Sequence, residues 1–203
     1  NVASAIFARD VSQGRYLETT SGYRLSSTYE ESGRALGSML DFRNVFMDVQ
    51  NFFPAPKEGS IAFRAVGGAS FGSDRKFFRT AGDDLLRGYG RYDPDNAASR
   101  FVATNLEYRF PIWLNANFHI WFFFPDFLFK NVYGSLFMDT GILWDSRAEF
   151  LSKSPQNLKH SLGVGLRFQA FVLQSVPISI QLDFARRTQD GEQVFYIGLG
   201  PHF

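Results

Sequence analysis

The amino-acid sequence predicts an all-β protein, an antiparallel transmembrane β-barrel of long strands. Three observations support this prediction. Of the 203 residues, 45% are hydrophobic and 24 are Phe, yet the mean hydropathy is slightly negative. The chain contains no run of about 18 apolar residues, the length that a membrane-spanning helix needs. Apolar and polar residues instead alternate with a period of two, as expected of strands that have two different faces.

Charge and cysteine content narrow the functional classes. The chain has 21 Lys and Arg against 20 Asp and Glu, so its net charge of +1 gives no long-range attraction to nucleic acid, and no nucleic-acid partner is expected. It has no Cys, which excludes disulfides, thiolate metal sites and Cys nucleophiles. Its first residues lack the basic and apolar regions of a signal peptide, so we interpret the sequence as a mature or excised segment.

The alternation predicts about nine strands, with roughly 20 residues for each strand and its turn. In the N-terminal half we expect strands at 3–9, 23–30, 39–50 and 61–71, of which 39–50 alternates least regularly. In the C-terminal half we expect strands at 102–110, 133–144, 162–169, 178–185 and 195–203. The clearest alternation sets Ile178, Ile180, Leu182 and Phe184 against Ser179, Gln181, Asp183 and Ala185.

The predicted connections alternate between short and long. Turns at 54–59 and 174–177 are short, loops at 73–96 and 146–160 are longer and polar, and 189–191 is a tight hairpin tip. No stretch resembles a linker, so residues 1–203 are expected to form a single domain.

Helical spacing is weak throughout the chain. Amphipathic helical character is considered only for 113–130, which is too short to span a bilayer but suits its interface.

Two architectures fit this pattern. One is a soluble β-sandwich or lipocalin-like barrel with an apolar interior, and the other is a membrane barrel with an apolar exterior and a polar lumen. Periodicity alone does not say which face is outside. The polar sides favour the membrane barrel, because they carry Gly, Arg, Glu and Asp at central strand positions while aromatic residues gather near strand ends.

Outer-membrane barrels have short periplasmic turns and long external loops, and their chains end on the periplasmic side. On that rule Asn1 lies on the external side, and the odd strand number indicates either missing upstream strands or an incomplete first strand. The loops expected outside are 73–97, 146–160 and 186–192, and the turns expected inside are 53–59, 111–131 and 173–177.

Two motifs support a family resemblance. The segment 73–97 contains Leu86-Arg87-Gly88-Tyr89-Gly90, and the strand at 133–144 contains Phe137-Met138-Asp139-Thr140-Gly141. With these motifs the chain resembles the BamA and TamA superfamily of outer-membrane assembly and translocation barrels, the bacterial surface antigen family. In that family the sixth external loop folds back into the lumen, and its Arg-Gly-Phe/Tyr tip meets the Asp of a Phe-x-Asp-x-Gly strand motif.

The resemblance implies that Arg87 pairs with Asp139 and that Glu107, on the preceding strand, supplies a second carboxylate. A guanidinium group binds a carboxylate through two parallel hydrogen bonds, and Gly allows a tight turn. Arg-Gly-Tyr-Gly alone would be an ordinary Gly-rich loop, but its place one predicted strand before Phe-x-Asp-x-Gly favours a loop lock. The residues expected to form this lock are Arg87, Gly88, Tyr89, Gly90, Glu107, Asp139 and Gly141.

The two ends of the chain also resemble the family. Residues 10–25 look like its periplasmic turn leading into a Gly-Tyr-x-Leu strand. Tyr196, Gly198 and Phe203 look like the β-signal that ends outer-membrane proteins. Pro201 departs from that signal, because proline cannot donate a hydrogen bond to a sheet.

The resemblance covers essentially all 203 residues but only about the last eight or nine strands of a sixteen-stranded barrel, with no periplasmic POTRA repeats. It implies an integral protein of the bacterial outer membrane with a periplasmic C-terminus. No cofactor, metal or enzyme activity is expected. The expected partners are outer-membrane lipid, including lipopolysaccharide, and client polypeptides or accessory assembly proteins.

The aromatic insert at 113–130 is longer than the usual turn and is similar to family members outside the BamA type.

Three patterns that suggest enzymes or metal sites are set aside. Residues 68–72 spell Gly-x-Ser-x-Gly, but a nucleophile elbow needs a helix to follow, and here a polar loop follows. His119, His160 and His202 are interpreted as interfacial or solvated residues. Residues 93–96, Asp-Pro-Asp-Asn, lack the Gly and the bidentate Glu of a calcium loop.

The leading hypothesis is a non-enzymatic outer-membrane barrel that takes part in the insertion, assembly or translocation of outer-membrane polypeptides. A client strand would add at a weakly closed seam between the first and last strands, where Tyr196, Gly198 and Phe203 would lie. One alternative is a small closed pore or surface-exposed binding barrel without insertase activity. Another is an outer-membrane hydrolase with its catalytic groups at the external rim.

Overall fold

The computed structural model describes residues 1–15, 18–82, 85–90, 96–120, 126–153, 158–173 and 175–200. The strands are β1 (Ala3–Asp10), β2 (Gln13–Arg15), β3 (Glu18–Ser32), β4 (Phe42–Ala55), β5 (Gly59–Phe71), β6 (Phe78–Arg79), β7 (Ala97–Ala98), β8 (Arg100–Trp113), β9 (Phe118–Ile120), β10 (Phe127–Trp144), β11 (Lys159–Val172), β12 (Val176–Arg187) and β13 (Gln193–Leu199). The helices are η1 (Arg34–Leu36) and α1 (Arg147–Lys153).

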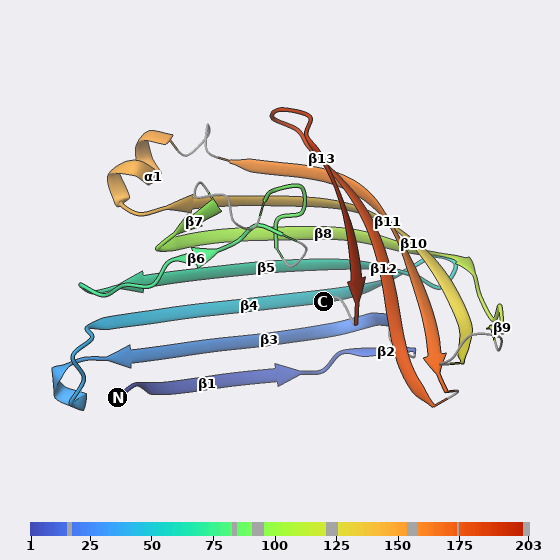
Figure 1. Cartoon of the computed structure of the whole chain (residues 1–203), viewed down its shortest axis with the longest axis horizontal. Helices are drawn as coiled ribbons and strands as arrows, with labels where there is room; N and C mark the ends of the chain where they lie inside the picture. Colours follow the sequence, from blue (N-terminus) through green and yellow to red (C-terminus); the bar gives the residue numbers. More distant parts are fainter. Residues whose placement is uncertain are drawn as a thin grey trace.

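The described residues form one large curved sheet with the strand order β1-β3-β4-β5-β8-β10-β11-β12-β13 (Figure 1). Every neighbouring pair on this path is antiparallel. The nine strands of the path confirm the predicted all-β class and strand number. The sheet is open in the part of the chain that is described, because β1 and β13 end the order without pairing with each other.

The two faces of the sheet have opposite character, as the alternation predicts. We call them the inner and the outer face. The inner face carries buried polar residues, among them Asn105, Glu107, Arg109, Ser135, Asp139, Arg167, Gln169, Gln181 and Asp183. The outer face carries exposed apolar residues, among them Ile61, Phe63, Val102, Leu106, Leu136, Met138, Leu162, Val164, Leu166, Phe184, Phe195, Ile197 and Leu199. This polarity is the reverse of a soluble sandwich and matches a transmembrane barrel.

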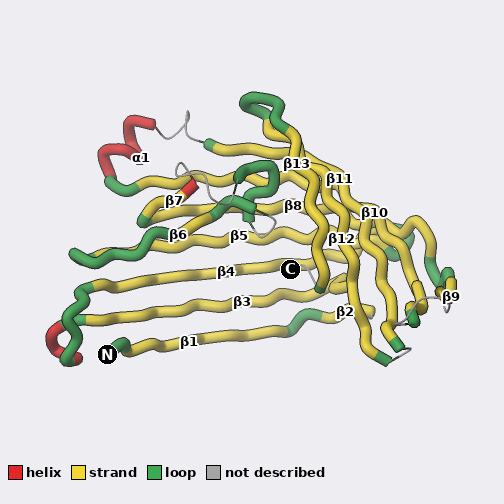
Figure 2. Tube along the Cα trace, viewed as in Figure 1, coloured by secondary structure: helices red, strands yellow, loops and turns green. Residues whose placement is uncertain are grey.

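The two ends of the sheet, which we call the loop end and the turn end, carry different connections: the longest connection, between β5 and β8, is at the loop end, and the turn end has short turns except for the connection between β8 and β10, which contains β9. Residues 56–58 join β4 to β5 at the turn end, while η1 and α1 both lie in loop-end connections (Figure 2). The hairpin after β12 also belongs to the loop end, because the Thr188 N–H donates to the His160 carbonyl at 3.1 Å. The predicted alternation of short turns and long loops therefore holds for most connections, but not for the long turn-end connection between β8 and β10 or the short loop-end hairpin after β12.

The expected helical character of 113–130 is wrong for its described residues. Phe118–Ile120 form β9, which pairs with the start of β10, and residues 121–125 lie outside the described part. Phe118, Phe127 and Phe129 thus lie in paired strands and not in an amphipathic helix. No helix in the described ranges is long and apolar enough to cross a membrane.

The α-helix of the described chain lies instead in the polar loop predicted at 146–160. The Glu149 N–H donates to Ser146 Oγ at 3.1 Å, and the Glu149 carboxylate accepts the Asp145 N–H at 2.9 Å. This reciprocal arrangement resembles a capping box and explains why the helix starts here.

Site-directed labels can test which face contacts lipid. Because the chain has no Cys, single cysteines can carry spin labels without background. In the membrane-embedded full-length protein, a label at Leu166, Leu182 or Ile197 should be relaxed by lipid-soluble oxygen. A label at Gly198, the inner-face neighbour of Ile197, should respond instead to a water-soluble nickel complex. Equal responses at positions 197 and 198 would contradict the assignment of the faces.

Candidate functional site

The connection between β5 and β8 packs against the inner face of the sheet. Leu86, in this connection, is completely buried. β6 and β7 pair and hold the two limbs of the connection together. The apolar cluster that anchors the connection comprises Val66 from β5, Phe101 and Ala103 from β8, Leu143 from β10, and Ala81, Leu86, Tyr89 and Ala98. This cluster forms an apolar contact area for the loop on the inner face, which is otherwise polar.

Arg87 lies beside Leu86 and binds Asp139 of β10 through two parallel hydrogen bonds. Arg87 Nε is 2.8 Å from Asp139 Oδ2, and Nη2 is 2.9 Å from Oδ1. The Arg87 backbone N–H adds a third contact to Oδ2 at 3.2 Å. Asn105, on the neighbouring strand, donates to Oδ1 at 2.9 Å. Charged, bidentate bonds of this kind are among the strongest in proteins, so Asp139 fixes both the position and the orientation of the guanidinium.

Two further carboxylates face the same guanidinium. Nη1 of Arg87 donates to Asp183 Oδ2 of β12 at 3.0 Å and lies 3.6 Å from Glu107 Oε2 of β8. Burial alone would lower the pKa of Arg87, but Asp139, Glu107 and Asp183 raise it above its ordinary value. The guanidinium therefore stays charged, and it links strands β8, β10 and β12.

The other two residues of the Phe-x-Asp-x-Gly motif also serve the loop. The Phe137 ring lies under Arg87, with its centroid 3.4 Å from Cζ, a geometry that favours a cation–π interaction. Gly141 makes room for Leu86, because a Cβ at this position would lie 2.7 Å from Leu86 Cδ1. In this motif, Phe137 and Asp139 thus contact Arg87, and Gly141 leaves space for Leu86.

The loop tip is tied to the last strands as well. Gly88 has a φ of +92°, which a side chain would strain. Its N–H donates to the Tyr196 hydroxyl of β13 at 2.7 Å, and its carbonyl accepts from Nε of Arg187. The Gly90 carbonyl accepts from Asn96 Nδ2 at 2.7 Å. The backbone of the tip is therefore held from several sides.

Tyr89 seats the tip against the start of β11. Its hydroxyl accepts the His160 N–H at 3.0 Å and contacts the His160 carbonyl at 3.1 Å. The Arg187 guanidinium lies 4.7 Å from the centroid of its ring. Hydrogen bonds to one strand and a cation from the next thus fix this ring.

A chain of buried ion pairs continues from the Arg87 site toward the turn end. Glu107 accepts hydrogen bonds from Arg167 Nη2 and, at 3.2 Å, from Arg109 Nε. Arg109 Nη1 in turn donates to Glu18 Oε1 of β3 at 3.0 Å. We call Arg87, Glu107, Asp139, Asp183, Arg109, Arg167 and Glu18 the inner-face charge network; each is at most 5% exposed.

The structure brings together most of the expected lock residues. Arg87 and Asp139 meet directly, whereas Glu107 lies farther from Arg87 than Asp183 does. Tyr196, expected at the seam, points to the inner face and contacts the loop. Gly198 pairs with Gln181 of β12. Residues 201–203, with the expected Phe203 and Pro201, lie outside the described residues.

Sequence reasoning missed several partners of the site. Asp183, Arg167, Arg109 and Glu18 were not expected to interact with it. The alternation already placed Asp183, Arg167 and Arg109 on the polar side of their strands. The alternation does not give the register between distant strands. That register decides which charged side chains contact one another.

The described residues among those set aside as catalytic or metal-binding candidates make other contacts. Ser70 Oγ lies 2.6 Å from Asn44 Oδ1 and accepts the Lys76 N–H at 2.8 Å, and residues 71–82 after it contain no helix. His119 contacts Asp126, and His160 Nδ1 contacts Thr140 Oγ1 at 2.9 Å. His202 and residues 93–95 lie outside the described part. In the described ranges, no group of His, Asp and Glu is arranged to hold a metal ion.

Removing the central guanidinium should destabilise the barrel strongly. Arg87→Ala leaves Asp139 and Asp183 buried without their cation, which should cost about 3–5 kcal/mol. Urea unfolding of the full-length protein in vesicles measures this loss. Arg34→Ala, at an exposed arginine in η1, is the matched control and should change stability by less than about 0.5 kcal/mol.

A double charge reversal extends this test. Arg87→Glu and Asp139→Arg together should recover part of the stability that each single change loses. Recovery should be incomplete, because Asp183 and Glu107 would then face a carboxylate. A double variant no more stable than either single variant would contradict the pairing.

Filling the gap under Leu86 should loosen the loop without touching a charge. Gly141→Ala places a methyl group against Leu86, and overpacking of this kind costs about 1–3 kcal/mol. Protease cleavage within 73–97 should become faster. Gly198→Ala is the control, since its new Cβ would meet Gln181 at an ordinary 3.7 Å. Equal cleavage rates in the two variants would contradict the role given to Gly141.

Comparison with known proteins bears on the fold and the family of the chain. The chain is similar to the crystal structure of BamA from Haemophilus ducreyi lacking POTRA domains 1-3, with a TM-score of 0.67 and 16% sequence identity. The match covers 98% of this chain and 42% of that chain, so this chain spans less than half of its length. A search of curated proteins finds no match. A family model described as the Omp85 superfamily domain matches residues 12–203. The chain therefore belongs to the Omp85 superfamily, a family of outer-membrane barrels for protein assembly and translocation.

Proposed function

We propose that this chain is the C-terminal part of a barrel that inserts, assembles or translocates outer-membrane polypeptides, and that it catalyses no reaction. The observation that supports this most directly is the loop tip. Arg87 and Gly88 together bind Asp139 of β10, Asp183 of β12 and Tyr196 of β13. The positions of the last strands thus depend on a seated loop. In this proposal, Arg87 and Asp139 have a structural and gating role.

The proposal includes a placement in the membrane. Residues 1–203 form a single barrel domain, with the loop end external and the turn end periplasmic. The segment 73–97 is an external loop folded into the lumen, and the C-terminus is periplasmic. The longest connection, between β5 and β8, lies at the loop end, and the β4–β5 and β11–β12 turns at the other end are short, which supports this orientation.

The proposed place of action is the outer edge of β13, the last strand of the order. In the proposed larger barrel, this edge closes weakly against the first strand. A weakly closed seam can open to a template for an added strand, so a client polypeptide can join here by β-augmentation. Client polypeptides and accessory assembly proteins are therefore the proposed partners, besides outer-membrane lipid.

Photo-cross-linking can test the edge directly. Ile197 of β13 and Leu182 of β12 are cross-strand partners, and both lie on the outer face. A photoreactive residue at position 197 of the full-length protein should cross-link to an unfolded outer-membrane barrel during its insertion into vesicles. The same residue at position 182, one strand inward, should cross-link far less.

The outcome separates the proposed function from its rivals. Equal cross-linking at positions 197 and 182 would indicate non-specific contact and contradict a specific edge. No cross-linking at either position, with the barrel folded, would contradict an insertion role at β13.

A further inference from the structure

A pocket on the outer face, at the loop end, is not explained by the inner-face charge network. Phe71 ends β5, Arg100 begins β8 and Trp144 ends β10, and Trp144 and Arg100 are cross-strand partners. By the alternation of the strands, their side chains share the outer face with Val102 and Met138. The pocket therefore lies at the rim of the apolar surface, where a membrane barrel meets lipid headgroups.

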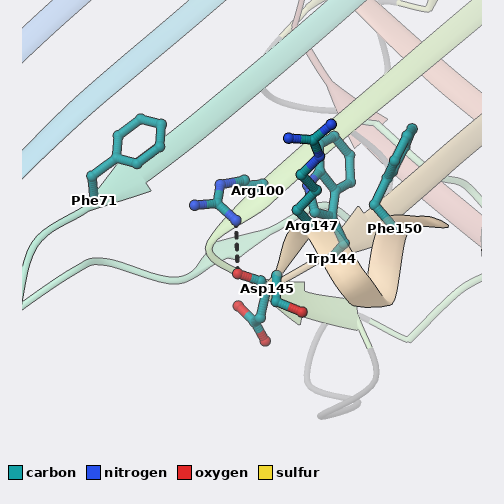
Figure 3. A pocket seen from close by; sticks show the side chains of 7 residues that line it. Phe71, Arg100, Trp144, Asp145, Arg147 and Phe150 are labelled. Atoms are coloured by element: carbon teal, nitrogen blue, oxygen red, sulfur yellow. Dashed lines mark hydrogen bonds between the residues drawn. The ribbon is translucent and has the colours of Figure 1, made fainter. Parts of the chain in front are cut away.

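The pocket combines aromatic walls with two cations. It has a volume of about 490 Å³, in the range of small-molecule sites. Figure 3 shows Phe71 on one side and Phe150 on the other, with Arg100 between them and Arg147 drawn over Trp144. The Trp144 and Phe150 rings pack with their centroids 4.9 Å apart. Folding of α1 against Trp144 thus brings Arg147 to the rim.

Both guanidinium groups have N–H donors that are available to a ligand. Arg147 is exposed and has no hydrogen bond or ion pair to another described residue. Nη1 of Arg100 donates to the Asp145 carbonyl at 2.8 Å, which leaves most of its five N–H donors available. The Arg100 guanidinium also lies 5.1 Å from the Phe71 ring, which holds it at the pocket wall.

The one carboxylate that lines the pocket does not neutralise these cations. Asp145 Oδ1 accepts the Ser99 N–H at 2.7 Å. Figure 3 shows this carboxylate pointing to the side opposite the two guanidinium groups. The nearby Glu149 carboxylate accepts the Asp145 N–H. The Asp145 carboxylate therefore points away from the side of the pocket where the guanidinium groups of Arg100 and Arg147 lie.

We propose that this pocket binds the phosphorylated sugar headgroup of an outer-leaflet glycolipid of the lipid A type. Guanidinium groups match phosphate oxygens in charge and in forked geometry. The aromatic walls offer apolar surface to the sugar ring and the first acyl carbons, and the outer face below continues as the apolar band that the acyl chains would follow. The inference rests on the proposed function, because that orientation places the loop end in the outer leaflet.

Lipid binding to the full-length protein in mild detergent tests the site. Native mass spectrometry would count bound bisphosphorylated lipid A, dephosphorylated lipid A and phosphatidylglycerol. Arg147→Gln should weaken lipid A binding about tenfold, the value of one charge-assisted hydrogen bond. Arg100→Lys keeps the positive charge but loses the forked N–H donors of the guanidinium, so it should weaken lipid A binding less than Arg147→Gln does. Arg34→Gln, an exposed loop-end arginine outside the pocket, is the control and should bind like the unchanged protein.

The lipid series decides between possible occupants. Preference for bisphosphorylated lipid A over the other two lipids, reduced by Arg147→Gln, supports the proposal. Equal binding of dephosphorylated lipid A would overturn the role of phosphate, and equal binding of phosphatidylglycerol would overturn the choice of a glycolipid. If the protein shows no preference for lipid A but still cross-links to the client at position 197, this inference alone is overturned. Loss of cross-linking with lipid A binding intact overturns the insertion role alone.

Discussion

One guanidinium group, that of Arg87, organises the inner face. It contacts carboxylates on three strands and lies over the Phe137 ring. A buried charge without a partner costs several kcal/mol, so the arginine and its carboxylates are tolerable only together. Partial withdrawal of the loop would leave charges on both sides unpaired. The contact therefore favours two states, seated or fully released, over a graded series of intermediate positions.

The inner face changes in character along the strands. Near the loop end it is apolar, where Val66, Phe101 and Leu143 receive Leu86. At the level of Asp139 it becomes charged, and ion pairs continue through Glu107 and Arg109 to Glu18. Apolar packing thus holds the loop around Leu86 and Tyr89, ion pairs hold Arg87, and hydrogen bonds hold the backbone of Gly88 and Gly90. Because every member of this ionic network is at most 5% exposed, salt should screen it very little.

The extent to which sequence predicted this structure follows from the range of each interaction. The nine strands and their two faces were predictable because a period of two is a local signal, readable in Ile178 to Phe184 alone. Arg87 and Asp139 were predictable because both lie in short motifs with a family resemblance. Asp183 and Glu18 were not, because they meet Arg87 and Arg109 across separations of 96 and 91 residues. The helix α1 was missed because its signal is a cap of a few residues, Asp145 to Glu149, inside a polar loop.

The length of β10 has a geometric consequence for the whole barrel. Its 18 residues extend roughly 60 Å at about 3.3 Å per residue. A strand tilted by about 45° needs only about 9–11 residues to cross a hydrocarbon core about 30 Å thick. At that tilt the 18 residues of β10 rise about 42 Å along the membrane normal, which matches the roughly 40–45 Å of a bilayer with its headgroups. In the proposed orientation, the ends of β10 therefore lie at headgroup level, and paired strands rather than loops meet the inner-leaflet headgroups where β9 joins β10.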